Sequence, residues 1–400
     1  MKKLLFILGA VLTFNCNAQT AYITNAGNNT VSVINVATNT VTATIPVSSY
    51  PGGVSVSSNG NKVYVTNYGA NTVNVINTTT NTVSATISVG NFPFGISVSP
   101  DGNKVYVANA VDNTVSVINT AADTVSATIP VGAYPYGMSV SPDGSKVYVA
   151  NSNTNTVSVI NTATNTVSDT ITVDDYPIGV SVSPDGSKLF VAGDSNTVSV
   201  INTATNTVST TIPVGAYPYG VSVSPDGTKV YVVNTGSNTV SVINVATNTV
   251  SATIPVGNQP EGISVSPDGT KVLYVANESS SSNTVSVINT ATNTVSATIP
   301  VGSNPIAFGN FISSYTTVLA SLCIEPVSIA IYPNPTTNNI TIEIPLQAVI
   351  EIYNMHMQLI KTIVADSNKT NIEVSNLTSG LYLIKVKTDK RVAVKKFVKE

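Results

Sequence analysis

The stretch PDGSKVYVAN, from Pro142 to Asn151, decides the fold of this chain because it is written several times. Each copy carries an aspartate, a glycine and a lysine at the same places, followed by a short run of alternating apolar residues. Proline presets φ near about −65°, aspartate bonds its own backbone and glycine accepts a positive φ, so the first half predicts a tight turn. The second half predicts a strand. Close variants begin at Pro100, Pro184, Pro225 and Pro267.

The aromatic residue of the YVAN element recurs with a period of 41 to 43 residues. It stands at Tyr22, Tyr64, Tyr106, Tyr148, Phe190, Tyr231 and Tyr274. An NTV element recurs equally often, beginning at Asn29, Asn71, Asn113, Asn155, Asn196, Asn238 and Asn283. Two independent motifs therefore define seven repeat units, and a period of this length is typical of solenoids and propellers.

Each unit contains four short alternating runs, which in one copy are Gly137 to Ser141, Lys146 to Ala150, Thr156 to Asn161 and Thr166 to Val173. Their connections are short and rich in turn-forming residues, so the runs are expected to pair as antiparallel neighbours. Valine and isoleucine alternate with serine, threonine or alanine, which gives each strand one apolar face and one face of small side chains. Such strands suit a sheet packed between two other sheets. The sequence therefore predicts an all-β, seven-bladed β-propeller.

The two ends of the repeat array are offset in a way that predicts a closed ring. The array begins with a second-strand run, Ala21 to Asn25, and ends with an extra first-strand run, Asn304 to Ile312. An interlocked blade assembled from both ends would remove the two exposed edges of an open array. An open solenoid is the alternative.

The chain resembles the YVTN-type β-propeller repeat proteins of prokaryotic surfaces. The matching elements are YITN, YVTN, YVAN, YVAN, FVAG, YVVN and YVAN, most of them followed by NTVSVIN and preceded by SPDG. The resemblance covers Ala21 to Ile312. It implies the propeller fold and a surface or binding role. It implies no particular reaction, because the members of the family share none and function belongs to sites and not to folds.

The connections from the last strand of one unit to the first strand of the next differ most among the units. They read SSYPGG, GNFPFG, GAYPYG, DDYPIG, GAYPYG, GNQPEG and GSNPIA. In a propeller they lie at the mouth of the central channel, where ring faces beside carboxylates and amides suit a sugar or an extended peptide. We predict a ligand-binding site made of Phe94, Tyr136, Ile178, Tyr219, Glu261, Tyr134, Tyr217, Asp174 and Asp175. The alternative is that these rings only pack adjacent blades together.

The predicted function is a non-catalytic binding or adhesion module, and a structural surface-coat protein is the alternative. A third candidate, a lactonase- or lyase-like propeller hydrolase, is disfavoured because no His and no Arg lies between Gln19 and Ile312. No cofactor and no metal site is expected. The formal net charge of −3 leaves no basic face for nucleic acid.

Six lysines follow the Pro-Asp-Gly turns or their equivalent, one per turn, and they are predicted to be solvated charges on one face. They are Lys62, Lys104, Lys146, Lys188, Lys229 and Lys271.

The first residues, MKKLLFILGAVLTFNCNAQT, place two lysines before a short apolar run. Cys16 and Ala18 are small residues at the −3 and −1 positions, so residues 1–18 are predicted to be a signal peptide cleaved after Ala18. A lipoprotein signal ending at Cys16 is the alternative, for which Asn15 is a poor fit. A membrane anchor would need about 18 apolar residues, which this run does not reach. After cleavage only Cys323 remains, so no internal disulfide is expected.

Composition changes after the last repeat. The chain is predicted to contain the propeller at 19–312, then a linker at 313–330 and a small Ig-like β-sandwich at 331–400. This tail resembles the type A C-terminal sorting domain of the type IX secretion system of Bacteroidetes. The matching motifs are YPNP at Tyr332, Pro333, Asn334 and Pro335, IYN at Ile352 to Asn354, SGLYLIKV around Gly380, and the terminal KKFVK. A glycine usual near Met357 is missing.

The sorting resemblance implies that the type IX secretion machinery carries the chain across the outer membrane. The protein is then anchored on the cell surface or released, with no transmembrane anchor after cleavage of the signal. His356 and Arg391 fall in this tail and are predicted not to be catalytic.

Overall fold

A computed structural model describes residues 19–269, 273–278, 283–313, 329–344, 348–354, 359–365, 367–387 and 392–400. These residues form two compact units, one spanning 19–313 and the other 329–400. The predicted signal peptide, most of the predicted linker with Cys323, and the tail residues His356, Met357 and Arg391 lie outside the described residues.

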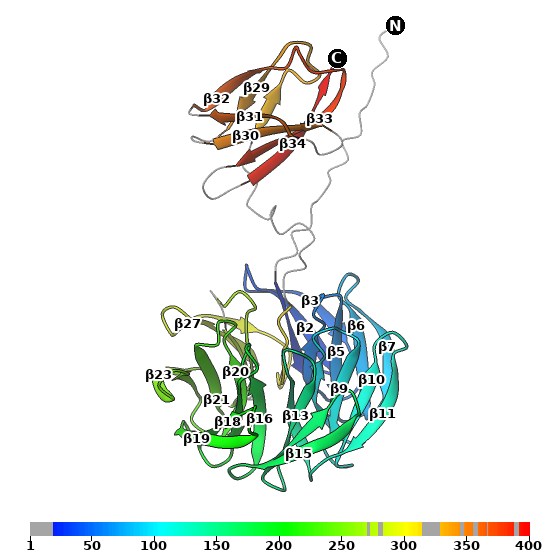
Figure 1. Cartoon of the computed structure of the whole chain (residues 1–400), viewed down its shortest axis with the longest axis vertical. Helices are drawn as coiled ribbons and strands as arrows, with labels where there is room; N and C mark the ends of the chain where they lie inside the picture. The colour runs from blue at the N-terminus through cyan, green and yellow to red at the C-terminus, as the bar shows by residue number, and fades with distance from the viewer. Residues whose placement is uncertain are drawn as a thin grey trace. The chain divides into compact units, whose positions relative to one another are not determined.

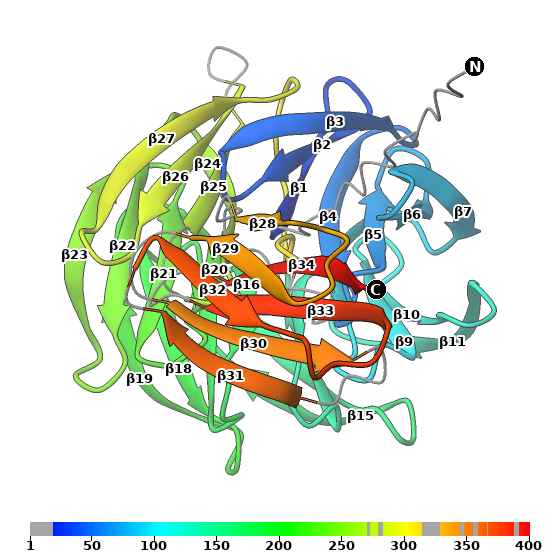
Figure 2. The ribbon, with the colours of Figure 1, turned by 90° about the horizontal axis from the view of Figure 1, so that it is seen from above.

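The first unit is a β-propeller, as the sequence predicts. Its strands form seven sheets, in agreement with the seven repeat units, and the sheets follow one another around a ring (Figure 2). Their bounds are β1 Thr20–Asn25, β2 Thr30–Asn35, β3 Thr40–Pro46; β4 Pro51–Val56, β5 Lys62–Asn67, β6 Thr72–Asn77, β7 Thr82–Ser88; β8 Pro93–Val98, β9 Lys104–Asn109, β10 Thr114–Asn119, β11 Thr124–Pro130; β12 Pro135–Val140, β13 Lys146–Asn151, β14 Thr156–Asn161, β15 Thr166–Thr172; β16 Pro177–Val182, β17 Lys188–Gly193, β18 Thr197–Asn202, β19 Thr207–Pro213; β20 Pro218–Val223, β21 Lys229–Asn234, β22 Thr239–Asn244, β23 Thr249–Pro255; and β24 Pro260–Val265, β25 Leu273–Asn277, β26 Thr284–Asn289, β27 Thr294–Pro300.

Within a blade the four strands pair in antiparallel order from the innermost to the outermost, as β12-β13-β14-β15 does. The two middle strands are buried on both faces, because Val147 and Val149 of β13 pack in one inter-blade cluster with β9–β12, and Tyr148 and Ala150 in the next. The outermost strand alternates, with Thr166 and Ser168 turned to solvent or to the rim. The alternation of apolar and small residues is therefore what lets neighbouring sheets stack.

The segment Asn304–Ser313 closes the ring, as the offset ends predict. On one side it pairs antiparallel with β1: the Tyr22 amide donates to the Phe311 carbonyl at 3.0 Å and the Ile306 amide to the Thr24 carbonyl at 3.0 Å. On the other side it runs parallel to β4, where the Val54 amide donates to the Phe308 carbonyl at 2.9 Å. We call Asn304–Ser313 the closing segment.

A glycine follows the Pro-X pair of each innermost strand because the next strand approaches too closely for a side chain. A Cβ on Gly95 would lie 1.9 Å from the Tyr136 carbonyl oxygen, and a Cβ on Gly137 would lie 2.1 Å from that of Ile178. Real Cβ atoms do not approach an oxygen so closely. The same approach is found at Gly53, Gly179, Gly220 and Gly262.

The repeated Pro-Asp-Gly turn is a closed hydrogen-bond network. The Asp143 carboxylate accepts from the Ser141 hydroxyl at 2.5 Å and from the Ser145 amide at 3.0 Å, while the Lys146 amide donates to the Ser141 hydroxyl at 2.9 Å. These bonds lower the pKa of Asp143 to about 2, with the Ser141 hydroxyl contributing most. Gly144 has a φ of 72°, as the turn requires.

The prediction that the lysines are solvated charges is wrong for those whose contacts are described. The Lys104 ammonium donates to the Thr162 carbonyl in the next blade at 2.8 Å, and Lys62 reaches both Thr120 and Asp123. Lys146, Lys188 and Lys229 make the same contact with Thr203, Val245 and Thr290. Each lysine therefore joins two blades, and its partner is 57 to 61 residues further along the chain.

The second unit is a two-sheet sandwich (Figure 1). One sheet has the order β28-β29-β32 and the other β31-β30-β33-β34, around a core that includes Ile340, Ile350, Ile384 and Phe397. The bounds are β28 Ala330–Tyr332, β29 Asn339–Glu343, β30 Ala348–Asn354, β31 Leu359–Ala365, β32 Lys369–Glu373, β33 Gly380–Lys387 and β34 Val392–Lys399.

The YPNP motif of the tail is fastened to the last strand. The Asn334 side chain accepts from the Val398 amide at 2.8 Å and donates to the Lys396 carbonyl at 3.3 Å, and the Tyr332 hydroxyl donates to Glu343 at 2.6 Å. Pro333 and Pro335 are exposed on either side of Asn334. Gly380 is the first residue of β33, and a Cβ added to it would lie 4.0 Å from its nearest neighbour, the Thr378 carbonyl oxygen.

Candidate ligand-binding mouth

Three positions in each blade build one face of the propeller, which we call the mouth. Pre-proline positions stand before the proline of each innermost strand; they are Tyr50, Phe92, Tyr134, Tyr176, Tyr217, Gln259 and Asn304. Post-proline positions stand directly after that proline; they are Gly52, Phe94, Tyr136, Ile178, Tyr219, Glu261 and Ile306. Post-strand positions follow the second strand; they are Ala26, Tyr68, Ala110, Ser152, Asp194, Thr235 and Glu278.

The post-proline rings pack around Phe308 of the closing segment. Its ring centroid lies 5.5 Å from that of Phe94, 5.7 Å from Tyr136 and 5.6 Å from Tyr219, and Phe308 is 6% exposed. Phe94 stacks on Tyr136 at 4.2 Å, and Ile178 joins the same cluster. The structure thus brings together four predicted site residues, but it buries most of their surface in a plug between the innermost strands.

The tyrosine hydroxyls of the plug are bonded to each other. Tyr136 and Tyr219 share a hydrogen bond across the plug. Burial raises the pKa of both phenols well above the ordinary value, and the nearby Glu261 carboxylate adds to that shift. Both hydroxyls therefore stay protonated at neutral pH and act as hydrogen-bond partners only.

Glu261 lies half-buried beside Glu278 at the edge of this plug. Desolvation raises the pKa of Glu261 well above its usual range, and the hydrogen bond and charge of the Glu278 carboxyl raise it further. Two carboxyls in contact cannot both ionise easily, which favours the protonated form of Glu261. The Tyr68 phenol is raised in pKa to about 12, first by burial and then by these carboxylates.

The backbone of each pre-proline residue fastens two blades together. The Tyr217 amide donates to the Asn196 side chain at 3.1 Å, and its carbonyl accepts from the Thr235 amide of the next blade at 2.9 Å. This geometry requires a left-handed backbone, with φ of 51° at Tyr217 and 50° at Tyr176. All seven pre-proline residues have φ between 49° and 58°.

The side chains at these positions are not what the backbone alone would select. Glycine and asparagine tolerate a left-handed φ best, and bulky residues tolerate it poorly. Asn304 fills the position in the closing segment, yet Tyr50, Tyr176 and Tyr217 fill it elsewhere and are 52%, 40% and 59% exposed. Tyr134 is half-buried and stacks on Tyr136 with 6.4 Å between the ring centroids. The rings of Tyr50, Tyr176 and Tyr217 therefore stay largely exposed on a backbone conformation that disfavours bulky side chains, although Tyr50 also packs on Tyr68 with 5.5 Å between the ring centroids.

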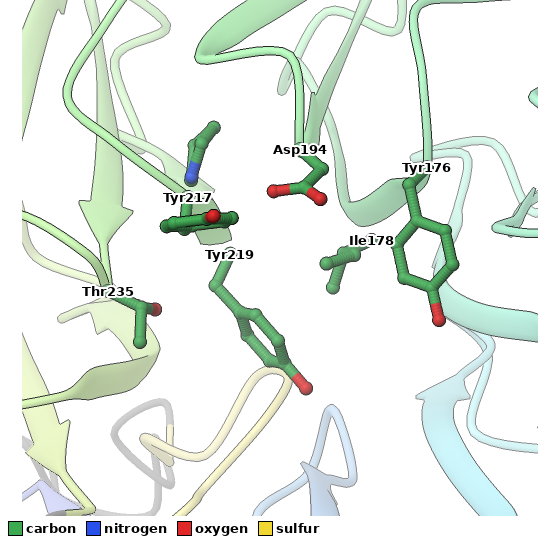
Figure 3. A pocket seen from close by; sticks show the side chains of 7 residues that line it. Tyr176, Ile178, Asp194, Tyr217, Tyr219 and Thr235 are labelled. Carbon is green, nitrogen blue, oxygen red and sulfur yellow. The ribbon is translucent and has the colours of Figure 1, made fainter.

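A pocket of about 300 Å³ opens between two of these rings. Figure 3 shows the Asp194 carboxylate between the rings of Tyr217 and Tyr176, with Ile178 below it and Tyr219 turned away. Thr235 lines the same pocket, but its hydroxyl already donates to the Pro260 carbonyl at 2.6 Å. The loop that carries Asp194 is one residue shorter than its equivalents, since Gly193 to Asn196 replaces the longer Asn151 to Asn155.

Asp174 and Asp175 are engaged by hydrogen bonds from neighbouring segments of the mouth. Asp174 accepts from the Thr197 hydroxyl at 2.6 Å, and Asp175 accepts from the Asn155 side chain at 2.8 Å. In other blades a buried asparagine makes the equivalent bond to the threonine, as Asn151 does to Thr156, and a glycine packs against it. In this blade the two positions hold other residues: Gly193 stands at the asparagine position, and Asp174 stands at the glycine position. That exchange favours a structural role for Asp174.

The predicted site omitted several mouth residues, among them Tyr50, Tyr176, Asp194 and Phe308. An alignment of the seven units would have exposed Asp194, because it stands at a post-strand position where each neighbour differs. Phe308 gave no such signal, since it occurs only in the irregular closing segment.

Among the residues that the structure describes, no three His, Cys, Asp or Glu side chains gather as metal ligands. No helix of the length and hydrophobicity needed to cross a membrane occurs in that part of the chain.

Comparison with known proteins agrees with the fold and the tail. Residues 12–285 match the family model of the Virginiamycin B lyase family, and the chain belongs to that family. Residues 330–400 match the secretion system C-terminal sorting domain. The protein is therefore a secreted or outer-surface propeller that the type IX secretion machinery handles, as the tail motifs predict. No curated protein matches the chain.

Two solved structures share the propeller. Hydrazine synthase of Kuenenia stuttgartiensis superposes with a TM-score of 0.62 at 25% identity, over 68% of this chain and 92% of that one. A functionally unknown protein from Desulfotomaculum acetoxidans DSM 771 superposes with a TM-score of 0.63 at 17% identity, over 72% and 99% of the two chains, and shows the fold alone.

Proposed function

We propose that this protein is a non-catalytic binding module of the cell surface or the secreted fraction, and that it reads a glycan or peptide at the mouth. The observation that carries the proposal is the set of exposed tyrosines at pre-proline positions. Their backbone conformation disfavours a bulky side chain, and their rings are available to a ligand. Strain retained at one face of a repeated fold supports a function there.

The proposal moves the recognition surface outward from the residues predicted first. Phe94, Tyr136, Ile178 and Tyr219 form the plug and support the mouth from below. Tyr50, Tyr134, Tyr176 and Tyr217 surround it and present ring faces. Burying one such ring against a ligand contributes about 1.5–3 kcal/mol by area.

The test uses asparagine in place of alanine. Tyr50→Asn, Tyr176→Asn and Tyr217→Asn in one chain remove three exposed rings and install a residue that suits the left-handed backbone, so the variant is expected to fold. Gln259→Asn is the matched control, because it makes the same backbone change where no ring is lost. The full chain is applied to glycan and peptide arrays, and the triple variant should lose the signals that the control keeps.

Two outcomes would contradict this proposal. An array without any signal favours the structural coat protein. Equal binding by the triple variant places the recognition surface away from the pre-proline tyrosines.

A lyase is the second candidate, favoured by the family match and by Glu261, a desolvated carboxyl beside Glu278 whose pKa is raised. A carboxyl with a raised pKa beside a phenol is suited to general acid or base chemistry. Incubation of the full chain with virginiamycin B, followed by chromatography, tests this candidate. Consumption of the compound by the wild type but not by Glu261→Gln would establish an enzyme and overturn the non-catalytic proposal.

A further inference from the structure

We infer that the pocket between Tyr176 and Tyr217 binds a cationic side chain, the ammonium or guanidinium group of a basic peptide. The inference rests on the proposed binding function and names the ligand class and the residues that would hold it. The first observation is the pocket itself, in which two exposed phenol rings flank the Asp194 carboxylate.

Asp194 is an exposed carboxylate that has no basic partner among the residues that the structure describes. The ion pairs of the described residues join Lys62 to Asp123, Lys369 to Glu343 and Lys387 to Glu351, and none involves the mouth. The Asp194 amide donates to the Asp175 carbonyl at 3.1 Å and to the Tyr176 carbonyl at 3.4 Å, in the connection before β16, which fixes the backbone while the carboxylate faces the pocket.

The charge of the whole mouth has one sign. Its loops carry acidic residues and no Lys, Arg or His; the acids are Asp112, Asp174, Asp175, Asp194, Glu261 and Glu278. Within residues 19–312, every lysine that the structure describes stands just after the turn at the opposite ends of the strands. Such a surface attracts cations over a distance of about a Debye length.

The chemistry of the pocket separates a cation from a neutral sugar. Both ligands could stack on tyrosine rings, and sugar hydroxyls could also donate to the Asp194 carboxylate, but a neutral sugar supplies no countercharge. An ammonium or guanidinium neutralises the carboxylate and is also attracted to the negative faces of the two rings. The uniform acidity of the surrounding loops favours the same ligand.

The probe is a hexalysine peptide, titrated calorimetrically into the full chain at low and physiological salt. Binding should weaken as salt rises, and hexalysine acetylated on its side chains should not bind. Asp194→Asn should weaken binding by about tenfold to a hundredfold, since it removes one charge-assisted hydrogen bond. Asp112→Asn, the same charge change on the same face away from the pocket, should change binding by no more than about twofold. Circular dichroism checks that both variants are folded.

The outcomes distinguish this inference from the proposed function. Binding of cellohexaose or of acetylated hexalysine in preference to hexalysine would overturn the cationic ligand and leave a binding module. Equal weakening by Asp194→Asn and Asp112→Asn would overturn the pocket and leave a diffuse acidic face. Absence of hexalysine binding also overturns the inference. If the glycan and peptide arrays give no signal either, the proposed binding function is rejected as well.

Discussion

The two faces of the propeller are made from the same repeat, but they differ in what their residues do. On the turn face, the Pro-Asp-Gly turns at Pro142, Pro184 and Pro225 repeat the same serine, aspartate and lysine bonds within the protein. At the mouth, the three positions of each blade hold different residues, and some remain exposed. Repetition therefore marks what the architecture needs, and departure from it marks where the molecule can recognise something else.

A similar contrast exists within the mouth. Post-proline rings are packed around Phe308, whereas Tyr50, Tyr176 and Tyr217 at pre-proline positions are exposed although their backbone is fastened to two blades. Position within the mouth, and not residue type, decides whether an aromatic ring contributes to stability or is available to a ligand.

The largest expected effect comes from emptying the plug. Phe308→Ala should lower the free energy of unfolding by about 3–5 kcal/mol, because the side chain is buried among three rings. Urea denaturation of the full chain, monitored by tyrosine fluorescence, measures the change in the free energy of unfolding. Tyr217→Asn is the comparison at the exposed edge of the mouth and should not destabilise the protein. Similar losses in the two variants would remove the distinction between the positions.

A smaller effect should follow from adding one methyl group at the mouth. Gly137→Ala places a Cβ against the Ile178 carbonyl, and overpacking of this kind costs about 1–3 kcal/mol or more. A Cβ at Gly144 on the turn face would make an ordinary contact with Pro100 at 3.6 Å, but its φ is 72°, so about 1 kcal/mol is expected for Gly144→Ala. Thermal melts of both variants give the order, and a reversed order would show that the innermost strands can move apart.

The inter-blade lysine contact should be weaker again. Lys104→Met keeps the apolar stem and removes the hydrogen bond to the Thr162 carbonyl, with an expected loss of about 1 kcal/mol. Lys395→Met, on an exposed strand of the tail, is the control and should stay within about 0.5 kcal/mol of the wild type. If Lys104→Met has the same free energy of unfolding as the wild type, the contact does not stabilise the propeller and Lys104 behaves as a solvated charge.

The smallest effect concerns the aspartates of the turn face and depends on pH. Because the folded-state pKa of Asp143 is about 2, below the unfolded value of about 3.9, its stabilisation is present above pH 4 and is lost as pH falls towards 2. Asp143→Asn should cost below about 0.5 kcal/mol at pH 7, since the turn is exposed and the first unit already uses Asn59 there. Denaturation midpoints of variant and wild type should converge between pH 4 and pH 2. A constant gap would contradict the assignment.

Much of the fold could be predicted from the sequence because the repeat samples each local rule several times. Strand alternation, turn chemistry and the offset ends each depend on neighbours along the chain. The lysines were misjudged because their partners lie 57 to 61 residues away, in the turn between the third and fourth strands of the following blade. No pattern among neighbouring residues indicates a contact across that sequence separation.

The mouth could be located from the variable connections, but the roles of its residues could not be separated. The sequence places Tyr217 and Tyr219 in one Tyr-Pro-Tyr motif, and the structure buries one ring and exposes the other. What separates them is the left-handed backbone before the proline together with the arrival of Phe308 from the other end of the propeller. Both are tertiary effects.

The closing segment gives the propeller a particular response to mechanical force. Its Asn304 end lies at the mouth and its Ser313 end, bonded to Thr20, lies at the opposite face. When the molecule is held through the chain that follows Ser313 and a ligand pulls at the mouth, tension runs along the closing segment. Its hydrogen bonds to β1 and β4 are then sheared together and do not open one after another. A tether attached at this point would resist flow better than one attached at a hairpin.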